Sequence, residues 1–287
     1  KLAEAKNAPI WAGVCVGSDV NAGAKLGAAV AAKVMARAKT DGMGSANNQA
    51  LTAAMISNSK ALGLPNPWIS QEIPMRPPML PNYGAVKTWN FDRSTLELIR
   101  PEKPYLEGSA EFNADLEELK SIQANQTRTQ AAIANYWADG PGSFTPPGHW
   151  HRYAAQAGVE AKLSELRMAR MFAYVGTALM DAGIGCWDTK YYYYSPRPQQ
   201  FGLKTSVGLP NFPSYTSGHS TFSYAASTVL SSLFPERTKT FEGYAQEASD
   251  SRVYGLIHFR VDCTMGGKHG KVIGAFAVQR AVADGAN

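Results

Sequence analysis

Cysteine is scarce in this chain, with 3 residues among 287. Cys15, Cys186 and Cys263 form no CxxC pair and show no metal-binding spacing, so a disulfide scaffold is excluded and at most one disulfide is possible. We expect all three to behave as small buried hydrophobic residues.

Long apolar runs are also absent. The best candidates, residues 26–32 and 220–234, are short or interrupted by Lys, Ser and Thr. A membrane-spanning helix needs about 20 predominantly apolar residues. We therefore predict no transmembrane segment.

Charged residues make up only 18% of the chain, and no run of Lys or Arg occurs. The 28 basic and 23 acidic residues are scattered, so the net charge of +5 does not indicate a nucleic-acid partner. The surplus suits an anionic ligand but decides nothing alone. A hydrophobic content of 45% is sufficient for a large core.

Alternation typical of strands is scarce, whereas helical periodicity is common, and no repeat is visible. The sequence predicts an all-α fold, a helical bundle, as one domain over 1–287. Its motif-bearing core would cover about 108–287, preceded by a helical and loop part at 1–107. We expect a long ordered loop at 63–104 and helices at 22–38, 113–136, 156–180, 219–233, from 239 onward and at 272–283.

A first motif places Lys190 and Arg197 seven residues apart, followed by Pro198. Pro196 and Pro198 make an uninterrupted helix unfavourable there. Alone, the pair is more typical of a solvated basic turn than of a site.

A second motif, Phe212-Pro-Ser-Tyr-Thr-Ser217-Gly218-His219, directly precedes a predicted helix. Free backbone N–H groups and the positive end of a helix dipole form an anion cradle, which Gly218 lets a ligand approach closely. Ser217 adds a hydroxyl donor, and His219 suits proton transfer near neutral pH. A plain helix cap beside an incidental histidine is equally compatible with this motif alone.

A third motif contains Ser251-Arg252 and then His258 and Asp262, four residues apart. On a helix this spacing lets the carboxylate hold the imidazole in one tautomer. Arg252 is off that face, so either its side chain reaches around or a helix starts between Arg252 and His258. A surface His–Asp pair is the alternative.

Taken together, the three motifs favour a site. Lys190, Arg197 and Arg252 would neutralise a tetrahedral oxyanion that Ser217 and Gly218 also bind. His258 would be its nucleophile or ligand, held by Asp262, and His219 the acid or base. This set is what transfer chemistry at phosphorus or vanadium requires. The remaining histidines, His149, His151 and His269, are predicted to be structural or on the surface, whereas Asp139 is a candidate to pair with Arg252.

The motifs resemble those of the superfamily of type 2 phosphatidic-acid phosphatases and vanadium-dependent haloperoxidases, K-x6-R-P, P-S-G-H and S-R-x5-H-x3-D. The first and third match fully, whereas Thr216 stands where the second has Pro. The resemblance implies bundled helices and an oxyanion bound by Lys190, Arg197, Ser217, Gly218, His219 and Arg252, with His258 bonded to it. It also implies vanadate as cofactor, with phosphate able to occupy the same site.

Two aromatic residues favour the chloroperoxidase-like branch. Trp187 stands three residues before Lys190, and Phe212 stands seven before His219, as in chloroperoxidases. We expect both to line a substrate pocket, although ordinary aromatic packing explains them too. Residues 135–150 also resemble bacterial haloperoxidase-like proteins.

The resemblance predicts a vanadate-dependent haloperoxidase that oxidises halide with hydrogen peroxide to a hypohalous species. The alternative is a phosphatase that hydrolyses phosphomonoesters or lipid phosphates through a phosphohistidine at His258. A module that binds phosphate without chemistry is a third class. Family analogy and the start at Lys1 rather than Met make export an expectation.

Overall fold

The computed structural model describes residues 1–285, and they divide into two compact units, Lys1–Gly44 and the chain from Ser45 onward. The first unit holds α1 (Leu2–Trp11) and α2 (Gly17–Ala38). Its helices bury none of their residues. The expectation of one domain over 1–287, with a division near residue 107, stays a prediction.

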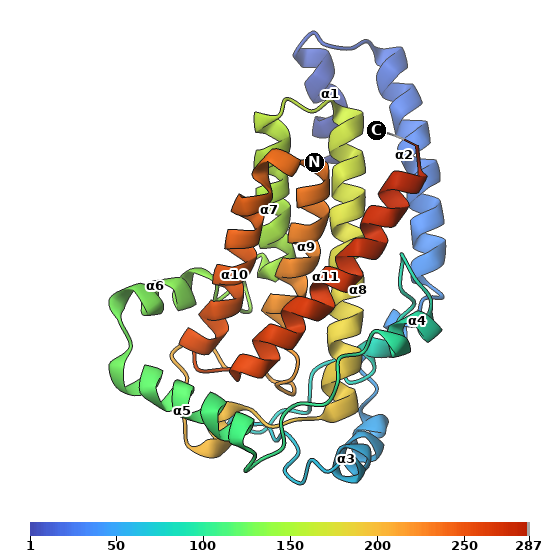
Figure 1. Cartoon of the computed structure of the whole chain (residues 1–287). Helices are drawn as coiled ribbons and strands as arrows, with labels where there is room; N and C mark the ends of the chain where they lie inside the picture. Colours follow the sequence, from blue (N-terminus) through green and yellow to red (C-terminus); the bar gives the residue numbers. More distant parts are fainter. Residues whose placement is uncertain (286–287) are drawn as a thin grey trace. The chain divides into compact units, whose positions relative to one another are not determined.

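The second unit is built from helices and loops, and no strand occurs within residues 1–285 (Figure 1). The all-α prediction is confirmed. Its α-helices are α3 (Thr52–Ala61), α4 (Arg93–Leu98), α5 (Ala110–Asn125), α6 (Arg128–Tyr136), α7 (Thr145–Glu160), α8 (Glu165–Tyr193), α9 (Gly218–Leu233), α10 (Thr238–Tyr254) and α11 (Arg260–Ala283). Short 3₁₀ turns are η1 (Met43–Ser45), η2 (Gln49–Leu51), η3 (Tyr83–Ala85), η4 (Pro198–Phe201) and η5 (Pro235–Arg237).

Two helix predictions were wrong because local caps divide the expected segments. Residues 113–136 form α5 and α6, since the Thr127 hydroxyl accepts the Gln130 N–H and the Gln130 side chain accepts the Thr127 N–H. This capping box starts a new helix. The helix expected at 156–180 is likewise split, because Ser164 caps α8.

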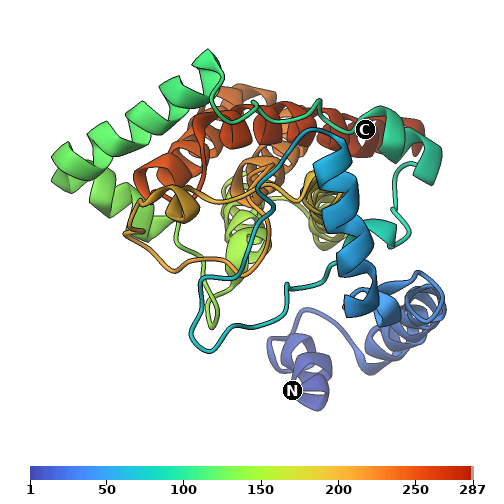
Figure 2. The ribbon, with the colours of Figure 1, turned by 90° about the horizontal axis from the view of Figure 1, so that it is seen from below.

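Helix α9 lies at the centre of the bundle and packs against α8, α10 and α11 (Figure 1). The main core joins side chains of α7–α11, among them Trp150, Val175 and Val229. Since α8 and α10 run toward one end of the bundle and α9 and α11 start there, all three motifs meet at this end, the side seen in Figure 2.

Glycines along α11 allow it to approach α9 closely. A Cβ at Gly266 would lie 2.9 Å from the Ser217 carbonyl oxygen, and one at Gly270 only 2.3 Å from the Thr221 carbonyl oxygen. The two glycines are one helical turn apart, so they share a face. This close approach brings the start of α11 to the start of α9.

We predict that Gly270→Ala lowers the free energy of unfolding by roughly 1–3 kcal/mol, because the added methyl group overpacks the α9–α11 contact. The control is Gly243→Ala on α10, where a Cβ meets nothing within 4 Å. That change should stabilise the helix by up to about 1 kcal/mol. Denaturant unfolding measures both, and equal effects would contradict the close contact.

His269 of α11 is buried in the bundle, and neither ring nitrogen has a hydrogen-bond partner. Burial lowers its pKa to about 3. Below the unfolded-state pKa near 6.5, the unfolded chain therefore binds a proton that the folded chain does not. Stability from this residue falls as pH drops from about 6.5 to 3, by about 1.4 kcal/mol per pH unit.

We predict that His269→Leu raises the free energy of unfolding, because the unpaired buried ring is replaced by an apolar side chain. Its advantage over the wild type should grow by about 1 kcal/mol between pH 7 and pH 5.5. Urea unfolding at the two pH values measures this, and a constant difference would show that His269 is not buried neutral.

Candidate oxyanion-binding site

Lys190, predicted to bind the oxyanion, is completely buried near the end of α8. Its ammonium donates to the carbonyl oxygens of Pro213 at 2.9 Å and of Ser214 and Thr216, both at 2.6 Å. These bonds use its three N–H groups to hold the loop before α9. Burial lowers the pKa of Lys190 to about 8, so it stays mostly protonated at neutral pH. Its charge lies among the predicted site residues, which we call the oxyanion cluster: Lys190, Arg197, Ser217, Gly218, His219, Arg252 and His258. Its direct donation to an oxyanion stays a prediction.

Arg197 follows α8 in an extended turn, as its flanking prolines predicted. Its Nε donates to the Phe212 carbonyl oxygen at 2.9 Å, and its Nη1 donates to that of Ile257 at 2.6 Å. Its Nη2 is buried and has no hydrogen-bond partner. Burial lowers the pKa of Arg197 to about 9, opposed by Asp262, so it remains a cation with a free donor.

The second motif caps α9. Ser217 is the N-cap residue, and its Oγ accepts the Ser220 N–H at 3.2 Å. This bond uses the oxygen as an acceptor, and the hydroxyl also reaches the Cys263 thiol, so its donation to an oxyanion stays a prediction. Gly218 and His219 begin the helix, as expected for an anion cradle.

His219 is partly exposed, but its Nε2 is buried and has no partner. Burial and the charge of Arg252 hold the pKa of His219 well below its usual range. The ring is therefore neutral at pH 7. A neutral imidazole with a free Nε2 can exchange a proton with a bound molecule.

Arg252 lies at the end of α10 and is 1% exposed. Its Nη2 donates to the Trp137 carbonyl oxygen at 2.7 Å and to that of Ala134 at 3.2 Å, and its Nε to Ser251 Oγ at 2.9 Å. Burial lowers its pKa to about 10, so it too stays charged. α10 ends at Tyr254 and α11 starts at Arg260, so a turn, not a helix start, separates Arg252 from His258.

His258 lies in that turn, immediately before α11, and Asp262 is in the first turn of α11. The sequence predicted that His258 and Asp262 would lie one turn apart on the same helix. Instead, the turn that caps α11 brings the two side chains together. His258 Nδ1 lies 2.9 Å from Asp262 Oδ2, and Phe259 N–H donates to the same oxygen at 3.2 Å. Burial raises the pKa of Asp262 to about 6. Burial and the neighbouring cations, first Arg197, hold the pKa of His258 well below its usual range.

This pairing decides which histidine nitrogen faces the cluster. With Nδ1–H donating to Asp262, the lone pair of His258 is on Nε2. That Nε2 lies 3.5 Å from Arg197 Nη1, and Nη2 of the same guanidinium group is buried without a partner. A neutral Nε2 beside a free guanidinium donor is suited to bond an oxyanion.

The sequence reasoning missed Ser214 and misassigned Asp139. The Ser214 hydroxyl donates to Asp262 Oδ2 and lies 3.3 Å from His258 Nδ1. Its only signal was its place in the second motif. Asp139 Oδ2 pairs with His149 Nδ1 at 3.0 Å rather than bonding Arg252, although its charge attracts Arg252.

The buried charges favour an anionic ligand. The three cations Lys190, Arg197 and Arg252 face two nearby carboxylates, Asp262 and Asp139, of which Asp139 bonds His149. One positive charge is left over, with an unpartnered donor at Arg197. Buried charge is costly unless paired, so a vanadate or phosphate fits this donor set. Within residues 1–285 no group of three or more His, Cys, Asp or Glu side chains could hold a metal ion.

Trp187 and Phe212, predicted to line a substrate pocket, pack against each other with ring centroids 4.8 Å apart. Phe212 lies beneath the charges, with Lys190 Nζ and Arg197 Cζ each 5.1 Å from its ring centroid. Trp187 also lines a cavity on the other side of α8. The pair thus borders the cluster, and Trp187 reaches a pocket.

Comparison with known proteins agrees with this geometry. Residues 171–284, which carry all three motifs, match the PAP2 superfamily. The superfamily recognised from the motifs is therefore confirmed. Among curated protein sequences, none matches this chain.

Three similar solved structures are vanadium-dependent haloperoxidases. A bacterial vanadium-dependent iodoperoxidase is 26% identical with a TM-score of 0.67, over 75% of this chain and 60% of its own. Bacterial vanadium-dependent chloroperoxidase in its apo form is 15% identical, with a TM-score of 0.60 over 70% and 56% of the two chains. Its holo form is 15% identical, with a TM-score of 0.56 over 70% and 55%. This chain thus spans about 60% or less of each.

Two further expectations concern cysteines and membranes. Cys186 and Cys263 are buried as expected, whereas Cys15 is partly exposed, and all three are free. In the described part of the chain, no helix has the length and apolar character that a bilayer span requires.

Proposed function

We propose that this protein is a vanadate-dependent haloperoxidase that oxidises halide with hydrogen peroxide. The observation that carries the proposal is the surplus buried positive charge beside His258 Nε2, bordered by Trp187 and Phe212. The similarity to a vanadium-dependent iodoperoxidase supports it.

In this function His258 Nε2 holds the oxyanion, and Asp262 keeps the imidazole in the required tautomer. Arg197 donates through its free Nη2, and Arg252 and Lys190 offset the negative charge. Vanadate, when bound, supplies a Lewis acid that polarises peroxide. His219, neutral with a free Nε2, accepts the proton that hydrogen peroxide loses on binding. Trp187 and Phe212 would present an apolar surface to this side of the site.

A phosphatase is the second candidate, because phosphate and vanadate share shape and charge and residues 171–284 match a superfamily with both activities. His258 would then attack phosphorus, and His219 would protonate the leaving alcohol. Export is retained as a prediction only.

The test is a pair of assays on protein stripped of oxyanion. One contains peroxide, bromide and a halogen-accepting dye, with vanadate added last, and the other contains a phosphomonoester without vanadate. We expect no dye reaction until vanadate is added, and competition by added phosphate. Rapid phosphoester hydrolysis without vanadate-dependent halogenation would establish the phosphatase instead. Tight vanadate binding without either activity would indicate a binding module.

A further inference from the structure

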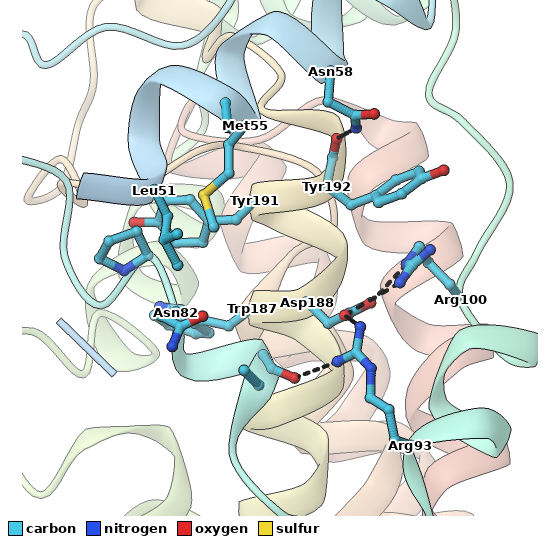
Figure 3. A pocket seen from close by; sticks show the side chains of 14 residues that line it. Leu51, Met55, Asn58, Asn82, Arg93, Arg100, Trp187, Asp188, Tyr191 and Tyr192 are labelled. Atoms are coloured by element: carbon cyan, nitrogen blue, oxygen red, sulfur yellow. Dashed lines mark hydrogen bonds and ion pairs between the residues drawn. The ribbon is translucent and has the colours of Figure 1, made fainter. Parts of the chain in front are cut away.

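A cavity of about 460 Å³ lies on the side of α8 that faces α3 and η3 (Figure 3). Its size is within the range of small-molecule sites, roughly 300–1,000 Å³. It lies outside the oxyanion cluster, since Trp187 is the only predicted site residue in its wall.

The greater part of the cavity wall is apolar and aromatic. Leu51 contributes from η2 and Met55 from the first turn of α3, and Trp187 and Tyr191 contribute from one face of α8. Both aromatic rings are anchored, because Trp187 Nε1 donates to the Met79 carbonyl oxygen at 3.3 Å and the Tyr191 hydroxyl donates to it at 2.5 Å. Anchored rings present preformed faces to a planar apolar group.

The polar end of the cavity is formed by two arginines and one aspartate. Asp188 accepts from Arg100 Nε at 2.6 Å and pairs with Arg93 Nη2 at 3.0 Å (Figure 3). Arg93 Nε also pairs with Glu97 Oε1 at 2.8 Å. Glu97 does not line the cavity, so the wall itself presents two guanidinium groups and one carboxylate. The Arg93 side chain is 50% exposed, which leaves it accessible to a ligand. This end favours one acidic group.

Trp187 separates the cavity from the oxyanion cluster. It packs on Phe212, which lies beneath Lys190 and Arg197. A Cβ added at Gly218 would lie 3.9 Å from Trp187 Cζ3, so the indole also reaches the start of α9. The same ring therefore borders both sites.

We propose that this cavity binds a small aromatic carboxylate, with its ring against Trp187 and Met55 and its carboxylate toward Arg93 and Arg100. We further propose that this carboxylate accepts the oxidised halogen, and this second part alone rests on the proposed function. A ring carbon forms a bond to the halogen of hypohalous acid while the halogen–oxygen bond breaks and its electron pair stays on oxygen. The ring C–H bond then breaks, and its proton joins the hydroxide to give water.

Calorimetric titration without vanadate, peroxide or halide tests the site by itself. The probes are 2-naphthoate and its neutral analogue 2-naphthamide. We expect naphthoate to bind about tenfold more tightly, the effect of one charge-assisted contact. Arg93→Gln should remove this preference, while Arg100 still pairs with Asp188. Equal affinities in the wild type, or no saturable binding, would overturn the proposal.

Two matched variants of α3 locate the binding. Ala54 lines the cavity and is exposed, so Ala54→Phe should narrow the opening without disturbing the core and weaken naphthoate binding at least about tenfold. Ala53 is exposed but does not line the cavity, so Ala53→Phe should bind as the wild type does. If Ala54→Phe and Ala53→Phe bound naphthoate equally well, the ligand would bind elsewhere and the proposed site would be refuted.

The outcomes separate this proposal from the proposed function. Naphthoate binding without vanadate-dependent halide oxidation would leave the cavity assignment standing and remove the haloperoxidase. Vanadate-dependent halide oxidation without naphthoate binding would leave the haloperoxidase standing and remove the cavity assignment. If both hold, Ala54→Phe should reduce halogenation of naphthoate but not halide oxidation measured without it.

Discussion

His258→Ala should abolish vanadate retention, because Nε2 of His258 is the nitrogen proposed to bond the oxyanion. No other histidine among the described residues pairs with Asp262, so none could take over this role. His219→Ala should retain vanadate but lose turnover by roughly 10²–10⁴-fold, the usual contribution of a positioned acid or base. Equilibrium dialysis measures retention, and bromide oxidation measures turnover.

The control for these variants is His151→Ala. His151 is half-buried on α7, and no contact joins it to the three motifs, so retention and turnover should match the wild type. Thermal unfolding of each variant identifies any loss due to misfolding. Wild-type vanadate retention in a folded His258→Ala protein would refute the assignment of His258.

Arg197→Ala should weaken vanadate binding by about 1.5–3 kcal/mol, the range for a hydrogen bond to a charged group. Its free Nη2 is the buried donor that points to an oxyanion. Arg197→Lys should recover only part of the affinity, because an ammonium cannot bond the Phe212 and Ile257 carbonyl oxygens and an oxyanion as the planar fork does.

Arg260→Gln serves as the control, since Arg260 pairs with Glu118 and Asp250 near the surface. Isothermal titration with vanadate gives the affinities, and denaturant unfolding reports the lost carbonyl contacts separately. Equal vanadate affinity in Arg197→Ala and Arg260→Gln would exclude Arg197 from the binding site.

The sequence predicted the fold class correctly, and the three motifs it singled out meet at one end of the bundle, whereas the membership of the site stays a prediction. Helical periodicity records which faces are buried, so α9 was placed within one residue of its start at Gly218. Motif spacing predicted Lys190, Arg197 and Arg252 as oxyanion ligands, and the structure buries all three, as a site for an anion requires. It failed at helix breaks such as Thr127, where a reciprocal cap stops one helix and starts another without Gly or Pro.

What the sequence by itself determined is therefore the set of ionisable groups and the helices that flank them. Only the tertiary structure decided how those groups share hydrogen bonds. Lys190 donates to three carbonyl oxygens, Asp139 pairs with His149, and Arg197 keeps a free donor. The physical reason is that backbone carbonyls carry no residue-specific signal, and their positions depend on how closely α11 packs on α9 through its glycines.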